Sequence, residues 1–123
     1  MTDSIGTVVV YSPDLFFGMR IRNALKQLGY ELALATTIEA FQQAIVAEPT
    51  PVLGIVDFNR GVDWEQFAPS IAGDVTVIAF GAHTDVDGFR AAKTAGVVRT
   101  LSNGSFNTSL PDLLARYAGT SAS

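Results

Sequence analysis

Short apolar runs alternate along this chain with segments whose apolar residues recur every three or four positions. The apolar runs predict five strands, at residues 7–11, 30–35, 51–57, 75–80 and 97–101. The periodic segments between them predict five helices, at residues 12–28, 38–45, 64–71, 85–95 and 110–117. Strict alternation of strand and helix indicates an α/β fold, with one parallel five-stranded sheet and helices on both faces. Because crossover connections are right-handed, few topologies remain, and the doubly wound strand order 2-1-3-4-5 is the leading prediction.

Residues that favour helix ends support these boundaries. The residues expected to cap the helices at their starts are Ser12, Thr36, Asp63 and Ser109. Gly96 is expected to end the fourth helix. Pro69 falls inside the third helical segment, so that helix is expected to be short or broken.

The length and composition are those of one folded domain. The chain has 123 residues, of which 48% are hydrophobic, and a chain of this size buries roughly two-thirds of its extended surface. We expect a single domain over residues 1–123, with its ordered core at residues 6–117 and a disordered tail at 118–123.

Charge and composition exclude several classes of function. The net charge of −4 disfavours binding to nucleic acid or to an anionic membrane. The absence of cysteine excludes disulfides and thiolate catalysis. No apolar stretch reaches the roughly 18 residues that a membrane helix needs, and no secretion signal is visible. A cytoplasmic location is therefore expected.

Polar and small residues follow several of the predicted strands at the edge of the sheet where parallel strands end. In the doubly wound order, ligands bind at this edge. Asp57 ends the buried run 52–56. The other residues expected to surround it are Ser12, Pro13 and Asp14 after the first strand, Gly81, Ala82 and His83 after the fourth, and Asn103 after the fifth. Glycine-rich phosphate-binding loops of the dinucleotide or Walker type are absent from the sequence.

This pattern resembles the receiver domain of two-component response regulators, which has the flavodoxin-like (CheY-like) fold. The resemblance covers roughly residues 6–117 as an order of strands and helices. Its most specific elements are Asp57 at the end of the third strand and the Ala95-Gly96 ending of the fourth helix. The resemblance makes Asp57 the equivalent of the phosphoacceptor.

Four positions depart from the receiver pattern. Receivers hold magnesium with two acidic residues after the first strand, where this chain has Ser12 and Pro13. They carry a threonine or serine where Gly81 lies and a lysine near Asn103. Phosphoryl transfer depends on positioning and charge neutralisation. We therefore expect a degenerate pseudo-receiver: a signalling protein that is not an enzyme, has no cofactor or metal, and is not efficiently phosphorylated.

Two other interpretations of the same edge stay open. In the first, Asp57 is phosphorylated in an unorthodox way, and Asp14 and Asn59 help to hold a weakly bound Mg²⁺. In the second, the crevice binds a small ligand in a flavodoxin-like manner. His83 with Arg60 is a candidate anion site there, although a single loop histidine is more commonly solvated surface. For Asp57 itself, a cap or loop role is the simpler interpretation.

The expected activity is protein–protein contact with a separate signalling partner. The chain has no room for an output domain, so we expect it to stand alone, as a monomer or a homodimer. Phe16 lies at the edge of the first helix beside Met19 and Arg20, a composition typical of binding hot spots; the alternative is that a wide apolar face buries it. The resemblance adds Phe89, Arg99 and Tyr117 as partner-binding candidates.

Overall fold

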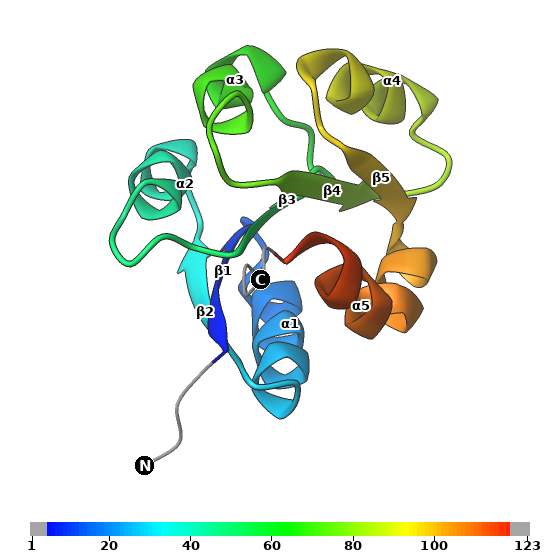
Figure 1. Cartoon of the computed structure of the whole chain (residues 1–123). Helices are drawn as coiled ribbons and strands as arrows, with labels where there is room; N and C mark the ends of the chain where they lie inside the picture. The colour runs from blue at the N-terminus through cyan, green and yellow to red at the C-terminus, as the bar shows by residue number, and fades with distance from the viewer. Residues whose placement is uncertain (1–4, 119–123) are drawn as a thin grey trace.

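The computed structural model describes residues 5–118 and contains one five-stranded parallel sheet (Figure 1). The strands are β1 (Gly6–Tyr11), β2 (Tyr30–Ala35), β3 (Leu53–Asp57), β4 (Val77–Gly81) and β5 (Arg99–Ser102). The helices are α1 (Leu15–Gln27), α2 (Ile38–Ile45), α3 (Trp64–Ile71), α4 (Val86–Ala95) and α5 (Asn103–Tyr117). The strand order is β2-β1-β3-β4-β5, with all neighbours parallel, so the predicted doubly wound topology is confirmed.

The sheet is covered on both faces, which explains why its strands are uniformly apolar. Helices α1 and α5 cover one face, and α2, α3 and α4 cover the other (Figure 1). Successive side chains of β1 point to opposite faces, so Val8 and Val10 join the α1–α5 core and Val9 joins the α2–α4 core. Every residue of β3 and β4 is buried, so these central strands hold their carboxyl ends rigidly in place.

Two helix caps differ by one or two residues from the sequence prediction. Asp14, not Ser12, caps α1, and its Oδ1 accepts hydrogen bonds from the amides of Phe16 and Phe17. Thr37, not Thr36, caps α2, and its Oγ1 accepts from the amide of Ala40. The Ser12 hydroxyl is directed to Asp57 instead, a long-range contact that local sequence does not reveal.

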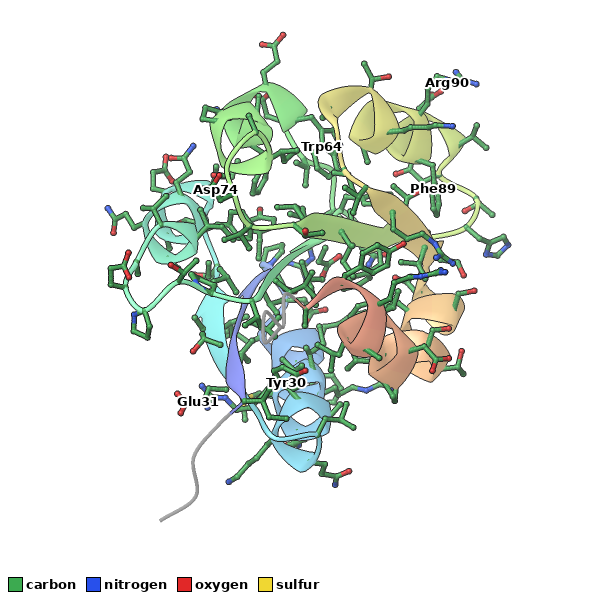
Figure 2. All side chains as sticks on the ribbon, viewed as in Figure 1. Tyr30, Glu31, Trp64, Asp74, Phe89 and Arg90 are labelled. Atoms are coloured by element: carbon green, nitrogen blue, oxygen red, sulfur yellow. The ribbon has the colours of Figure 1, made fainter. Side chains whose placement is uncertain are left out.

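Helices α3 and α4 follow the prediction closely. Asp63 caps α3, which is short but continues through Pro69 to Ile71. Trp64 and Phe89 lie on the side of the sheet that carries α3 and α4 (Figure 2). Gly96 ends α4 with φ +104°, a left-handed conformation that glycine adopts without steric cost.

The predicted start of the last helix, at residue 110, was wrong. α5 begins at Asn103 with Ser102 as its cap, so the expected cap Ser109 lies inside the helix. Residues 102–109 are mostly Ser, Asn, Gly and Thr, which favour loops when read locally. Phe106 is buried and stacks on Phe80 at 4.2 Å between ring centroids, and this tertiary contact favours the longer helix.

The end of the described chain is packed rather than free. Ala118 is buried in the core beneath α1 and α5, so the expected tail does not begin at residue 118. Residues 119–123 of that predicted tail lie outside the described residues. Within residues 5–118, no helix is long and apolar enough to cross a membrane.

Candidate functional site

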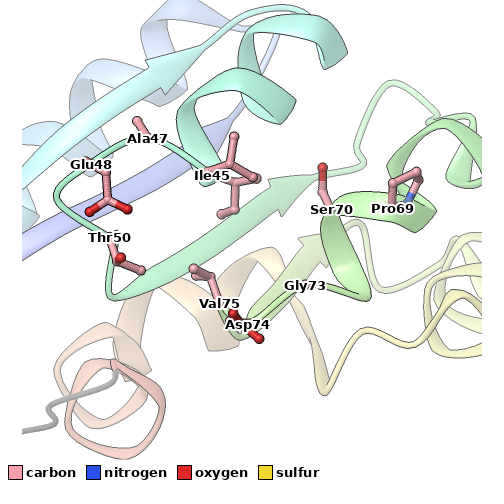
Figure 3. A pocket seen from close by; sticks show the side chains of 10 residues that line it. Ile45, Ala47, Glu48, Thr50, Pro69, Ser70, Gly73, Asp74 and Val75 are labelled. Carbon is pink, nitrogen blue, oxygen red and sulfur yellow. The ribbon is translucent and has the colours of Figure 1, made fainter.

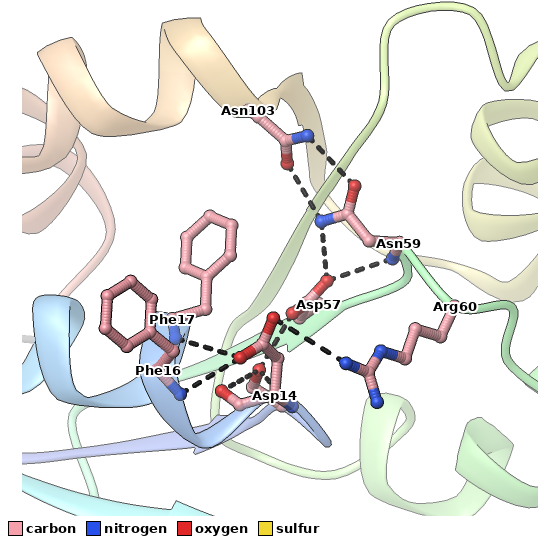
Figure 4. A network of polar contacts seen from close by, with 8 residues as sticks. Asp14, Phe16, Phe17, Asp57, Asn59, Arg60 and Asn103 are labelled. Atoms are coloured by element: carbon pink, nitrogen blue, oxygen red, sulfur yellow. Dashed lines mark hydrogen bonds and ion pairs between the residues drawn. The ribbon is translucent and has the colours of Figure 1, made fainter.

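Asp57 lies at the carboxyl edge of the sheet, at the end of β3, and is only 2% exposed. Its two carboxylate oxygens accept hydrogen bonds from different neighbours (Figure 4). The Ser12 hydroxyl donates to Oδ2 at 2.8 Å. The backbone amide and the side-chain Nδ2 of Asn59 donate to Oδ1 at 2.9 and 2.7 Å. Three donors therefore satisfy this buried carboxylate from within the chain.

Asn59 also joins the β3–α3 loop to the start of α5. Its Nδ2 donates to Asn103 Oδ1 at 2.9 Å, and Asn103 Nδ2 donates back to Asn59 Oδ1 at 2.9 Å (Figure 4). Sequence analysis placed Asn103 beside Asp57, and the structure links the two through Asn59. Asn103 therefore holds the loop in place with a neutral amide pair, where a lysine would bring a positive charge.

Asp14 lies at the mouth of the site. Its Oδ1 caps α1, and its Oδ2 forms a 3.8 Å ion pair with Arg60. Both side chains are substantially exposed, at 38% for Asp14 and 64% for Arg60, so solvent screens the pair. Pro13 lies between Ser12 and Asp14 and has no amide proton to offer.

The ring of Phe58 fills the space above Gly81. A Cβ atom added to Gly81 would lie 2.7 Å from Phe58 Cζ, closer than real carbon atoms approach. Phe58 is 1% exposed and packs edge-on against Phe89 and Trp64, with centroid separations of 5.2 and 6.0 Å. A hydroxyl-bearing side chain at position 81 would therefore need this aromatic cluster to move.

Tyr11 brings a phenol close to the same site from the end of β1. Burial raises the pKa of Tyr11, and the negative charge of Asp57 raises it further. Both effects disfavour the phenolate, so the hydroxyl of Tyr11 stays protonated through the physiological range.

The remaining predicted site residues are less involved. Ala82 is half-buried and His83 is exposed in the loop after β4. Within residues 5–118, no hydrogen bond or ion pair joins the His83 side chain to Asp57. Arg60 forms its ion pair with Asp14, and the anion site of His83 with Arg60 stays a prediction.

The partner-binding candidates divide into free and packed side chains. Phe16 is 79% exposed, and with exposed Leu15 and Met19 it forms an apolar patch on α1, here called the α1 patch. Arg99 is exposed and donates to the Tyr117 hydroxyl at 3.5 Å on the β5–α5 surface. Phe89 is half-buried against Phe58, so much of its ring is occupied inside the fold.

Sequence analysis missed two central residues of the site. Phe58 was not predicted as a site residue, although the sequence shows a large apolar residue directly after Asp57, because its contact with Gly81 forms only in the folded sheet. Asn59 was considered only as a weak metal ligand. An aspartate whose carboxylate accepts from the backbone amide two residues on is a known local turn, but the second partner of Asn59, Asn103, is 44 residues away.

The comparisons with known proteins agree on one architecture. No family model and no curated protein matches the sequence. Among solved structures, a response regulator receiver protein from Burkholderia phymatum is 25% identical, with a TM-score of 0.76 over 93% of this chain and 95% of that one. The non-phosphorylated HemR receiver domain from Leptospira biflexa is 14% identical, with a TM-score of 0.73 over 93% and 94% of the two chains.

A CheY-like response regulator receiver domain protein from Methanospirillum hungatei is also similar, with 14% identity and a TM-score of 0.72 over 93% of this chain and 97% of that one. The predicted resemblance to receiver domains is therefore confirmed, and the receiver protein of 25% identity supports a response-regulator-like signalling function. The chain has the fold of a response-regulator receiver domain, with a changed set of residues around Asp57.

Proposed function

We propose that this chain is a pseudo-receiver, a signalling module that binds a protein partner without efficient phosphorylation of Asp57. The observation that supports this most directly is the occupied state of the carboxylate. Both oxygens of Asp57 accept hydrogen bonds within the chain, and the residue is 2% exposed. To attack the phosphorus of a donor, an oxygen of Asp57 would have to give up at least one of these hydrogen bonds, and the donor would have to enter a closed site.

The residues near Asp57 do not fit a receiver-type magnesium site. Magnesium needs several oxygen ligands in near-octahedral geometry. Asp14 is the other carboxylate at this edge, and its two oxygens are used by the α1 cap and by Arg60. Within residues 5–118, no group of three Asp, Glu or His side chains is placed to hold a metal. We propose that the chain acts by binding a partner, without an enzymatic activity or a resident cofactor of its own.

The α1 patch is the surface that best fits a protein partner. Leu15, Phe16 and Met19 are 61%, 79% and 48% exposed, and they adjoin one another at the start of one helix. Exposed aromatic and methionine side chains of this kind concentrate binding energy in protein interfaces. The β5–α5 surface with Arg99 and Tyr117 is the second candidate surface.

Phosphorylation is tested by incubating the protein with acetyl phosphate and magnesium, followed by intact-mass measurement. An ordinary receiver domain treated in parallel is the positive control. We expect no gain of a phosphoryl group here, and amide NMR spectra that do not change with magnesium and beryllofluoride. Phosphoryl gain that disappears in Asp57→Asn would instead establish the phosphorylatable alternative.

Partner binding is tested by affinity capture with the wild-type chain, Phe16→Ala and Tyr117→Ala, each compared with Val46→Ala. Val46 is 74% exposed but lies at the end of α2, away from both candidate surfaces. We expect a captured protein to be lost with Phe16→Ala and retained with Val46→Ala. Equal capture by all four chains would refute both surfaces.

A further inference from the structure

Asn103 and Gly104 begin α5 and form the one Asn-Gly pair in the sequence. In such a pair the backbone nitrogen of the glycine can attack the side-chain amide of the asparagine, because glycine has no Cβ atom to obstruct the approach. The other asparagines of the chain are followed by Ala24, Arg60 and Thr108. Asn103 is therefore the position where spontaneous deamidation is chemically easiest.

The backbone nitrogen of Gly104 is accessible to solvent. Gly104 is exposed, and a Cβ atom added to it would meet no other atom within 4 Å. The first amides of a helix have no acceptor within the helix. The Ser102 cap accepts from the amide of Ser105, and among residues 5–118 no acceptor binds the amide of Gly104. This nitrogen can therefore lose its proton to a solvent base without first breaking a hydrogen bond.

The side-chain amide of Asn103 is polarised by Asn59 (Figure 4). Asn59 Nδ2 donates to Asn103 Oδ1 at 2.9 Å, and this oxygen gains negative charge when Asn103 Cγ is attacked. A donor already directed at that oxygen stabilises the tetrahedral intermediate. Helix ends fray, and Asn103 is the first residue of α5, so its backbone can turn to bring Cγ toward the nitrogen of Gly104.

We propose that Asn103 is a deamidation site, and that its conversion opens the link between the β3–α3 loop and α5. The Gly104 nitrogen gives its proton to a solvent base and forms a bond to Asn103 Cγ. The bond between Cγ and Nδ2 breaks, and Nδ2 takes up a proton from the protonated base and leaves as ammonia. The cyclic imide that remains is opened by water, and residue 103 becomes aspartate or isoaspartate. The net reaction consumes one water molecule and releases one ammonia.

Either product changes the interactions of Asn59. The new carboxylate has no proton to donate, so Asn59 Oδ1 loses the hydrogen bond that Asn103 Nδ2 supplies at 2.9 Å. The new negative charge also approaches the carboxylate of Asp57, to which Asn59 Nδ2 donates at 2.7 Å, and like charges repel. A neutral amide pair is thus replaced by an arrangement that separates the loop from α5. The change occurs whether or not Asp57 accepts a phosphoryl group.

The conversion is measured by incubating the full chain in mildly alkaline buffer, followed by trypsin digestion and fragment-mass analysis. Peptide 100–116 contains both Asn103 and Asn107, so Asn107 is an internal reference. A sample digested without incubation gives the background. We expect Asn103 to convert roughly tenfold or more faster than Asn107, as for a barrier lower by about 1.4 kcal/mol. Equal rates at the two asparagines, or no change at Asn103, would overturn the assignment.

A variant of the attacking residue tests the route. Gly104→Ala should slow the conversion of Asn103 roughly tenfold, because the added methyl group obstructs the nitrogen while meeting no other atom of the fold within 4 Å. Ser105→Ala is the matched control, since it changes the same helical turn, leaves the Asn-Gly pair intact and should convert at the wild-type rate. Equal slowing in the two variants would refute attack by the Gly104 nitrogen.

A second variant tests the consequence for the loop. Asn103→Asp reproduces the charge of the aspartate product. We expect it to shift the side-chain amide resonances of Asn59 and the backbone amides of residues 57–61. Asn107→Asp adds the same charge at an exposed position of α5 and should leave these resonances unchanged. Unchanged Asn59 resonances in Asn103→Asp would overturn the proposed opening of the link.

Discussion

The two edges of the sheet differ in how their polar groups are partnered. At the carboxyl edge, Asp57 accepts three hydrogen bonds, and Asn59 and Asn103 pair reciprocally. At the amino edge (Figure 3), Glu48 and Asp74 are exposed and form no ion pair among the described residues. The carboxylate at the carboxyl edge is therefore enclosed by the chain itself, while the carboxylates at the amino edge are left to solvent.

This difference shows that the backbone of a fold can be kept while the side chains at the carboxyl edge of its sheet differ. The central strands β3 and β4 are buried and hold Asp57 in place whatever surrounds it. Gly81 has no side chain, and Phe58 fills the space beside it, so the core stays filled. The closed edge is therefore a packed and hydrogen-bonded arrangement, and removing single members should destabilise it.

The largest expected effect is that of Phe58→Ala. Deleting a fully buried phenylalanine removes apolar burial and leaves a cavity beside Gly81, at a cost of about 3–5 kcal/mol. Denaturant unfolding measures this loss. Phe16→Ala is the matched control, since its ring is 79% exposed and its removal should change stability by less than about 0.5 kcal/mol. Similar losses in the two variants would contradict the closed arrangement.

Gly81→Thr should destabilise the protein by about 1–3 kcal/mol, because the new side chain collides with Phe58. Combined with Phe58→Ala, the threonine gains space, so the double variant should lose less stability than the sum of the two single losses. Gly104→Thr is the control, because a Cβ atom there meets no other atom within 4 Å. Strict additivity would show that Phe58 does not restrict position 81.

Asn59→Ala should cost about 1–3 kcal/mol, because Asp57 Oδ1 loses a side-chain donor while the carboxylate stays buried. The same change also removes the pairing with Asn103. Asn107→Ala, at an exposed position of α5, is the control and should change stability by less than about 0.5 kcal/mol. Thermal unfolding of both variants is the measurement. Equal stability of Asn59→Ala and Asn107→Ala would show that the Asn59 side-chain amide does not stabilise the site.

Removing negative charge at the amino edge should raise the stability of the fold, in contrast to the losses expected at the carboxyl edge. Glu48→Gln and Asp74→Asn each take a negative charge away from a helix carboxyl end and should stabilise the fold by about 0.3–1 kcal/mol at low salt. Glu39→Gln provides the contrast, because Glu39 lies in the first turn of α2, where a negative charge is favourable. Destabilisation by all three variants would mean that the amino edge is not electrostatically unfavourable.

The smallest effect is confined to alkaline pH and concerns Tyr11. Burial, with a contribution from Asp57, raises the pKa of Tyr11 in the folded state. The unfolded chain therefore loses this proton first, so stability is full below about pH 10 and falls as pH rises from there through the folded-state pKa. Tyr11→Phe should flatten this fall in pH-dependent unfolding, and an unchanged fall in that variant would contradict the role of Tyr11.

The sequence predicted which residues lie at the carboxyl edge of the sheet. It did not predict the hydrogen bonds and packing contacts among them. Asp57, Ser12 and Asn103 follow successive strands, so strand order alone places them at one edge. Ser12 donates directly to Asp57, and Asn103 is linked to Asp57 through Asn59. No local pattern encodes the contact between Asn59 and Asn103, which are 44 residues apart. Phe58 was missed because its role depends on Gly81 in the neighbouring strand.

The sequence by itself determined the α/β alternation, the strand order and the place of Asp57, because hydrophobic periodicity and connection handedness are local and general constraints. Only the tertiary structure decided that α5 begins at Asn103, since the stacking of Phe106 on Phe80 outweighs loop-favouring residues. It likewise decided that Asp57 is enclosed and that the carboxyl ends of α2 and α3 line one hollow at the amino edge of the sheet. Such features depend on contacts between residues far apart in the chain, and these form only when the elements pack together.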